Sequence, residues 1–307
     1  GFIESAYAPW LRANRKRAEK TLLDLGRCFG DLQAKRLTDI SRGDLDAYVA
    51  SRRDNGRSAA TIVRDLNNLR SVLRLAIERG YLRESPFKGW RAPKVADSGI
   101  TRYLSPDEEG RLRAALAARD EQVRRERASA NSWRVERGYA LLSAIPGGEY
   151  PDHMTPMTLL SLNTGLRFGE VAALEWPAID FRARVLTVRA ATAKGAKTRH
   201  VPLNDEARDL LKRWRGQGSG AGLVFPGPEG SRIASVKTAW SGVLKRAGVN
   251  GFRWHDLRHT FASKLVQRGV DLAVVRELLG HGDFALTLRY AHLEARQKFE
   301  AVARLTA

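Results

Sequence analysis

The stretch that decides the fold runs from Arg253 to Leu293 and reads RWHDLRHTFASKLVQRGVDLAVVRELLGHGDFALTLRYAHL. Its apolar residues recur at helical spacing, and Gly269, Asp271, Gly280 and Asp283 stand where helices are capped or stopped. The pattern predicts three short helices separated by tight turns. Basic side chains and a lone tyrosine gather at those turns, which leaves two interpretations, a packed helical surface or a site.

Composition narrows the class of protein. The chain has 307 residues, enough for two ordinary domains, and its 43% apolar content is typical of soluble globular proteins. No run of about eighteen apolar residues predicts a membrane span, so we expect no membrane partner. The single cysteine, Cys28, excludes an internal disulfide framework and a cysteine-based zinc cluster, so we expect a cytoplasmic setting with Cys28 in the core. The chain begins at Gly1 without a methionine, and we expect a fragment or a processed product.

The charge points to a polyanionic partner. Lys and Arg number 53 against 34 Asp and Glu, a net charge of +19, and the basic residues are spread over the whole chain. Each phosphate that Lys or Arg neutralises releases condensed counterions, so nucleic acid is the favoured partner. The alternative is a soluble protein whose arginine excess reflects a GC-rich genome.

The first ninety residues are predicted to form helices joined by short turns. One helix begins at Ser41 and stops at Asn55-Gly56, and the next runs from Ser58 to Gly80. The second helix has one apolar stripe, formed by Ile62, Leu66, Leu69, Leu73 and Ile77. Its polar face suits a phosphate backbone or a major groove, and the alternative is a solvated surface. The candidate DNA contacts of this region are Arg57, Arg64, Asn67, Asn68 and Arg74.

A linker and a second domain follow. Residues 86–102 contain Pro86 and Pro93 without apolar periodicity, and we expect domains at 1–88 and 103–307 with a linker at 89–102. Ser105 caps the next helix and pairs with Glu108 in a capping box. Residues 119–153 are predicted to hold a further helix and a loop, without chemistry of their own.

Two later segments complete the predicted fold. TPMTLLSLNTGLRFGEVAALEW is an apolar helix broken at Thr164-Gly165 that restarts with Arg167 in the first turn of the next helix. In RVLTVRAATAKGAKTRHVPL the side chains alternate with the period of a β-strand. The pattern predicts a β-hairpin whose tip carries Lys194 and Lys197. The expected fold class is mainly α with a small antiparallel β-sheet: an N-terminal helical domain followed by an α+β domain.

Several basic side chains stand beside helix starts or turns, where amide groups and guanidinium forks can hold a phosphate together. His255 and Arg258 are three residues apart on a helix and point the same way. Glu170 stands in the same relation to Arg167 and is placed to orient its guanidinium. Tyr290, expected on the last short helix, is placed to face the same spot.

Five motifs carry a resemblance to a known family. TGLRFGE, KGAKTRHVPL, HDLRHTFAS, LLGH and TLRYAHL, in this order and at these separations, resemble the tyrosine recombinase (phage integrase) family. The front half, from LTDISRGDLDAYVASRR to AIERGYLRESPFKGW, resembles the helical, SAM-like core-binding domain of these enzymes. The resemblance covers nearly the whole chain and is weakest between about residues 119 and 153.

The resemblance implies a role for each motif residue. Arg167 and Arg258 match the two arginines that hold the scissile phosphate, and Tyr290 matches the nucleophile. Glu170 matches the acidic residue that supports the first arginine. The remaining matches are His255 to the histidine of the His-x-x-Arg motif, His281 to the position of histidine or tryptophan before the tyrosine, and Lys194 to the hairpin lysine. Lys197 is the fallback for Lys194 and otherwise a candidate DNA contact.

The chemistry accounts for these residue types. Two arginines meet the negative charge that gathers on the phosphate oxygens. A tyrosine hydroxyl is a weak nucleophile near neutral pH, and we expect His255 to help it ionise. The 5′ oxygen needs a proton to depart, which a hairpin lysine supplies as general acid. The product is a 3′-phosphotyrosyl link that keeps the bond energy, so strand exchange needs neither ATP nor a metal, and we expect no cofactor.

The resemblance implies a site-specific DNA recombinase that integrates or excises a mobile element. The alternatives are a DNA-relaxing topoisomerase with the same tyrosine chemistry and a non-catalytic DNA-binding protein on this scaffold. Taken singly, each motif residue has an ordinary structural interpretation, and for His259, Arg289 and His292 we keep it, expecting them to pack or contact backbone.

The expected partner is double-stranded DNA in a bacterial or phage setting, associated with the nucleoid. We expect a homotetramer on DNA, a monomer or weak oligomer when free, and accessory DNA-bending proteins. The residues after Tyr290 form a helix-prone tail that either docks on a neighbouring protomer or packs on its own domain, with Leu293, Phe299, Val302 and Leu305 as the candidate contacts.

Overall fold

The structure is a computed structural model that describes residues 1–15, 17–95, 101–189 and 198–294. The chain divides into two compact units, residues 1–98 and 99–307. Each unit has its own hydrophobic core. The predicted fold class, mainly helical with a small antiparallel sheet, is confirmed.

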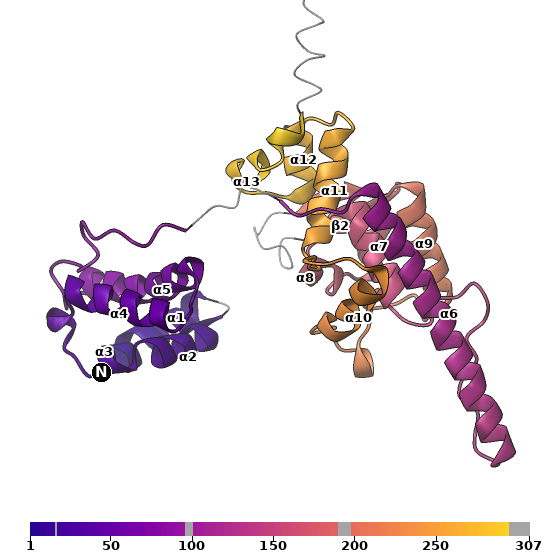
Figure 1. The fold of residues 1–307 in the computed structure, drawn as a ribbon, viewed down its shortest axis with the longest axis horizontal. Helices are drawn as coiled ribbons and strands as arrows, with labels where there is room; N and C mark the ends of the chain where they lie inside the picture. The colour runs from indigo at the N-terminus through magenta and orange to yellow at the C-terminus, as the bar shows by residue number, and fades with distance from the viewer. Residues whose placement is uncertain (16, 96–100, 190–197, 295–307) are drawn as a thin grey trace, which may run out of the picture. The chain divides into compact units, whose positions relative to one another are not determined.

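The regular elements of the first unit are all helices within its described part (Figure 1). Ser41 begins a helix as predicted: its side chain accepts a hydrogen bond from the Asp44 amide, and the Asp44 carboxylate accepts one from the Ser41 amide at 2.9 Å. Ser58 caps the next helix through the Thr61 amide. The elements are η1 (Ile3–Tyr7), α1 (Ala8–Asn14), α2 (Ala18–Cys28), α3 (Gly30–Gln33), η2 (Leu37–Asp39), α4 (Arg42–Asp54) and α5 (Ala59–Glu78).

Helix α5 supplies the centre of the first core. Its predicted stripe is buried from Ile62 to Leu73, whereas Ile77 is half-buried. Part of the stretch predicted as a linker also packs here, because Phe87 is buried and the Trp90 indole donates to Asp46 Oδ1 at 2.8 Å. The packed part of this unit therefore extends to about residue 90.

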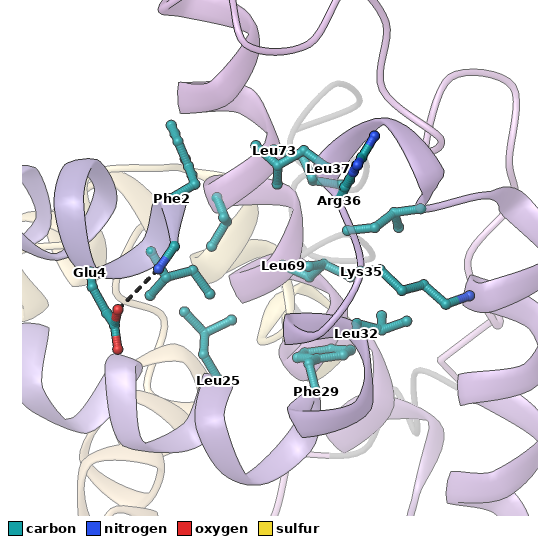
Figure 2. Close-up of a pocket in the computed structure, with 14 residues that line it drawn as sticks. Phe2, Glu4, Leu25, Phe29, Leu32, Lys35, Arg36, Leu37, Leu69 and Leu73 are labelled. Atoms are coloured by element: carbon teal, nitrogen blue, oxygen red, sulfur yellow. Dashed lines mark hydrogen bonds and ion pairs between the residues drawn. The ribbon is translucent and has the colours of Figure 1, made fainter.

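A hollow of about 400 Å³ lies within the first unit (Figure 2). Apolar side chains line much of it, including Leu25, Phe29 and Leu69. Lys35 and Arg36 also border it. The motif that carries Tyr290 belongs to the other unit.

The second unit places helices around a three-stranded antiparallel sheet, in the order β1-β2-β3. Its register sets Leu186 opposite both Ile179 and Val201, which fixes one buried face. Strand β1 has two residues and was not predicted. The first elements are α6 (Pro106–Glu136), α7 (Met154–Thr164), α8 (Phe168–Val171), η3 (Trp176–Ala178), β1 (Ile179–Asp180), β2 (Val185–Val188) and β3 (Arg199–Pro202).

The remaining elements close the unit and build a second, smaller core. Helices α11 and α12 bury Val266, Val275 and Leu279 against Tyr290. Within the described residues, no helix has both the length and the apolar character needed to cross a membrane. The elements are α9 (Asp205–Gly216), η4 (Pro228–Gly230), α10 (Lys237–Ala247), α11 (Asp256–Gln267), α12 (Leu272–Leu279), α13 (Ala285–Leu288) and η5 (Ala291–Glu294).

Helix α6 differs from the prediction. The Ser105 capping box is present, with the Glu108 carboxylate accepting from the Ser105 amide at 3.0 Å, but one helix of 31 residues runs on to Glu136 where two helices were expected. Its second half extends away from the rest of the unit (Figure 1). The returning chain is bound to it by polar contacts, such as a paired amide contact between Asn131 and Leu142 at 2.9 Å each way. We call residues 121–149 the α6 arm.

Candidate active site

A sharp turn between α7 and α8 places Arg167. Gly165 ends α7 in the left-handed conformation, with φ of 63°, and a Cβ there would lie 2.5 Å from the Phe261 ring. Arg167 then occupies the N-cap of α8. The Glu170 carboxylate accepts hydrogen bonds from the Arg167 amide at 2.9 Å and from its Nη1 at 3.0 Å. The predicted support of Arg167 by Glu170 is therefore a direct contact in this structure.

Glu170 also binds a second arginine that the sequence interpretation missed. Arg199 Nη1 and Nη2 donate to the two carboxylate oxygens of Glu170 at 3.1 and 2.7 Å, and both side chains are buried. Burial raises the pKa of Glu170, but the hydrogen bonds and charges of Arg199 and Arg167 outweigh it, so the net shift is downward. A signal was present in the sequence, because Arg199 shares the inward face of β3 with Val201.

Arg258 lies in the first turns of α11 and is only 2% exposed. Its Nη1 donates to the Gly165 carbonyl at 2.9 Å and its Nη2 to the Leu279 carbonyl at 2.6 Å. Burial and the charge of Arg167 lower the pKa of Arg258 to about 9, and it stays protonated near neutral pH. The guanidinium is thus fixed between the ends of α7 and α12.

Positive charge is left over in this cluster. Among the described residues, Glu170 is the carboxylate that contacts Arg167 and Arg199, and the described contacts of Arg258 are two neutral carbonyls. Three guanidinium groups thus share one carboxylate, which leaves two uncompensated positive charges. Buried charge without a partner is costly, so the cluster favours an anion.

Two predicted histidines flank the cluster. His255 is the N-cap residue of α11, and partial burial of its ring together with the charge of Arg258 lowers its pKa. His281 follows the left-handed Gly280 after α12 and shares a hydrogen bond with Thr287 Oγ1 at 2.9 Å. Burial and the charges of Arg258 and Arg167 lower the pKa of His281 to about 3. Both rings are therefore neutral near pH 7, and each has one ring N–H that can donate a hydrogen bond to an anion's oxygen.

Tyr290 lies in the turn between α13 and η5, so its predicted place on the last short helix is wrong. The side chain is 1% exposed, and its hydroxyl lies 2.7 Å from Nδ1 of His259. Burial raises the pKa of Tyr290 to about 12, against the opposing charges of Arg258 and Arg289. His259, expected only to pack or contact backbone, therefore contacts the predicted nucleophile directly.

The remaining predicted residues divide into two groups. Lys194 and Lys197, and the tail residues Phe299, Val302 and Leu305, lie outside the described residues. The candidate DNA contacts of the first unit lie at or near the surface: Arg57, Arg64, Asn67 and Arg74 are exposed, and Asn68 is half-buried.

Comparison with known proteins bears on both units. The profile of the Phage integrase family matches residues 140–297, and that of the Phage integrase N-terminal SAM-like domain matches residues 6–80. The tyrosine recombinase XerC of Xanthomonas axonopodis pv. citri is 32% identical over 261 residues, which cover 81% of this chain and 73% of that protein. The integrase of Salmonella phage P22 is 38% identical over 144 residues, 43% of this chain and 37% of that protein.

Solved structures agree on the fold. The Tn1549 transposon integrase in complex with transposon right end DNA has a TM-score of 0.69 at 21% identity, covering 97% of this chain and 98% of that one. A lambda integrase dimer bound to a core site has a TM-score of 0.64 at 18% identity, covering 92% of each chain.

Proposed function

The chain belongs to the phage integrase family of tyrosine recombinases, enzymes that cleave and rejoin DNA at specific sites, and we propose that it does so with a two-arginine phosphate clamp and an attacking tyrosine. The phosphate clamp is Arg167 and Arg258. The nucleophile is Tyr290. The supporting groups are Glu170, His255, His281 and Lys194, with Lys197 as the fallback for Lys194.

The uncompensated charge of the clamp carries this proposal. A phosphodiester brings one negative charge, and its transition state for displacement gathers a second on the non-bridging oxygens. The cluster holds two positive charges without a described carboxylate, so it complements the transition state better than the bound substrate. Glu170 neutralises the third guanidinium and sets the angle of Arg167.

The other groups handle protons and orientation. His255 and His281 are neutral and hold the phosphate oxygens by hydrogen bonds. The hairpin lysine protonates the departing 5′ oxygen as general acid. Tyr290 forms the 3′-phosphotyrosyl bond, and the 5′ hydroxyl of another strand reverses the step.

The substrate is double-stranded DNA, and Arg57, just before α5, contributes contacts to its backbone together with Arg64 and Arg74 on the polar face of α5. The chain assembles as a homotetramer on DNA and works in the bacterial cytoplasm at the nucleoid, with accessory DNA-bending proteins. A phage integrase and a transposon integrase are among its relatives by sequence or fold, which supports integration or excision of a mobile element as its role.

A nicked duplex tests the proposal. The sequence is obtained by selecting, from a random pool, the duplexes that the wild-type chain binds most tightly. We expect a denaturant-resistant complex with wild type and none with Tyr290→Phe. Exchange of strands between two such sites marks a recombinase, whereas relaxation of a supercoiled plasmid without exchange marks a topoisomerase. A wild-type chain that binds the duplex without covalent attachment contradicts the proposal.

A further inference from the structure

His259 is a buried titratable group that the mechanism above does not use. It lies one residue after Arg258 on α11, is 8% exposed, and contacts the Tyr290 hydroxyl at 2.7 Å. The two rings are 6.0 Å apart between centroids. Thirty-one residues separate the two positions in sequence, so only the fold brings them together.

The surroundings of His259 keep its ring neutral. Burial and the neighbouring His255 lower its pKa to about 4. The charged groups that act on it are Asp256, which opposes this shift, and Arg289 and Arg253, which add to it. A neutral imidazole with its proton on Nε2 presents a lone pair at Nδ1. The tyrosine hydroxyl is then the donor of the 2.7 Å hydrogen bond.

Attack on phosphorus requires that Tyr290 lose this proton. Its pKa is raised to about 12 by burial, although Arg258 and Arg289 oppose the rise, so little tyrosinate exists near neutral pH. A proton acceptor must lie within hydrogen-bond reach of the proton it takes. His259 meets that criterion, whereas no hydrogen bond to Tyr290 is described for His255, whose ring centroid lies 5.1 Å from that of His259.

We propose that His259 is the general base for Tyr290, orienting its hydroxyl and accepting its proton as the phosphotyrosyl bond forms. In this step the Tyr290 oxygen bonds to phosphorus, the bond from phosphorus to the 5′ oxygen breaks, and the tyrosine proton moves to Nδ1 of His259. The 5′ oxygen takes its proton from the separate general acid. In the reverse step His259 returns its proton to the departing tyrosine oxygen. This inference rests on the proposed function, since it assigns a partner to the same nucleophile.

The test uses the full chain and the nicked duplex obtained above. His259→Phe removes the acceptor, and His259→Gln keeps a hydrogen-bond acceptor that cannot take a proton. His200→Gln is the matched control, because His200 is an exposed histidine on β3 that bonds to Thr187. The rate of covalent attachment is measured from pH 6 to 9, with duplex affinity and circular dichroism recorded for each variant.

We expect both His259 variants to form the covalent complex about 10²-fold more slowly at pH 7, with unchanged duplex affinity, and the control to match wild type. Without the base, attack needs tyrosine that is already ionised, so the variants' rates should rise about tenfold per pH unit toward pH 9. A structural role alone leaves the pH profile unchanged. A duplex with sulfur in place of the 5′ bridging oxygen should not restore the rate, because a thiolate leaves without a proton and replaces only the general acid.

Three outcomes overturn the inference. Wild-type rates in His259→Gln would show orientation without proton transfer. Faster attachment in His259→Phe would show that the contact restrains the tyrosine. Full recovery with the sulfur duplex would place His259 on the leaving-group side. Failure of the proposed function is distinct, since the wild-type chain itself would then form no covalent complex.

Discussion

Arg199 binds the Glu170 carboxylate with both terminal nitrogens, and its Nε donates to the Leu278 carbonyl at 3.0 Å. One side chain on strand β3 thus joins α8, which carries Glu170, to the end of α12. Since Glu170 also holds Arg167, the position of the first clamp arginine depends on Arg199, a residue to which the motif pattern assigned no role.

Glu170→Gln should cost both stability and activity. Removing one partner of a buried ion pair leaves Arg199 uncompensated, and we expect the free energy of unfolding to fall by about 3 kcal/mol. Urea denaturation checks this value. Glu78→Gln, which breaks the exposed Arg74–Glu78 pair, is the control and should change stability by no more than about 0.5 kcal/mol. Equal effects of the two substitutions would show that burial of the Glu170–Arg199 pair does not increase the free-energy cost of breaking it.

Gly280→Ala should displace Arg199. Gly280 has φ of 64°, and an added Cβ would lie 2.8 Å from Arg199 Cδ. We expect a destabilisation above the roughly 1 kcal/mol that a left-handed alanine costs. Gly248→Ala is the matched control, with φ of 62° and no atom within 4 Å of the added Cβ. Thermal unfolding compares the two variants, and a destabilisation no larger than that of the control would mean that Arg199 adapts freely.

Arg258→Lys should abolish most cleavage while leaving duplex binding nearly intact. Lysine keeps the charge but lacks the planar fork that joins the Gly165 and Leu279 carbonyls. Loss of one hydrogen-bond donor to the transition state raises the activation free energy by roughly 3 kcal/mol, so we expect covalent attachment to slow about 10²-fold. Arg137→Lys serves as control, because Arg137 directly follows helix α6 within the α6 arm and lies over the Trp133 ring. A normal rate in Arg258→Lys would argue that charge alone suffices at this position.

Acid should destabilise the second unit before its carboxylates titrate. The pKa values of His281 and His259 are lowered to about 3 and about 4, whereas unfolded histidine titrates near 6.5. Below pH 6.5 the unfolded state therefore binds more protons than the native state, and stability falls as pH falls. Each such histidine contributes a slope of about 1.4 kcal/mol per pH unit between pH 6 and 4. Urea midpoints across this range should give a shallower slope for His259→Gln than for wild type.

The α5 face of the first unit, together with Arg57 just before α5, should contribute to the salt dependence of DNA binding. Removing one phosphate-binding side chain reduces the slope of log affinity against log salt by about 0.9. We expect this change for Arg57→Gln and for Arg64→Gln, measured by fluorescence anisotropy with a random-sequence duplex. Arg27→Gln, an exposed arginine on α2 paired with Asp24, is the control. A similar change in the control would assign the slope to general surface charge.

Local signals in the sequence predicted much of this fold. Ser41, Ser58 and Ser105 cap helices, and Gly165 and Gly280 end them in the left-handed conformation, because these functions depend on a few adjacent residues. The α6 arm escaped prediction because its charged second half has no buried stripe to show where it ends. Strand β1 escaped because two residues carry no periodicity.

The site shows the same division between local and distant information. The motif order identified Arg167, Glu170 and Arg258, which the fold brings into one charged cluster. It did not identify Arg199 or His259, whose partners lie 29 and 31 positions away. His259 follows Arg258 directly, so the α-helix turns its side chain about 100° away from that of Arg258. Its partner, Tyr290, is brought to it only by the tertiary fold.

The α6 arm has a practical consequence for handling the protein. A segment fastened by side-chain contacts to backbone, without a core of its own, opens at lower free energy than the helices around Arg258. Proteases should therefore nick the chain first near Gly138 or Gly147, both exposed in the return path. The two fragments would stay joined through the hydrophobic core, making this loop a natural place to insert a reporter.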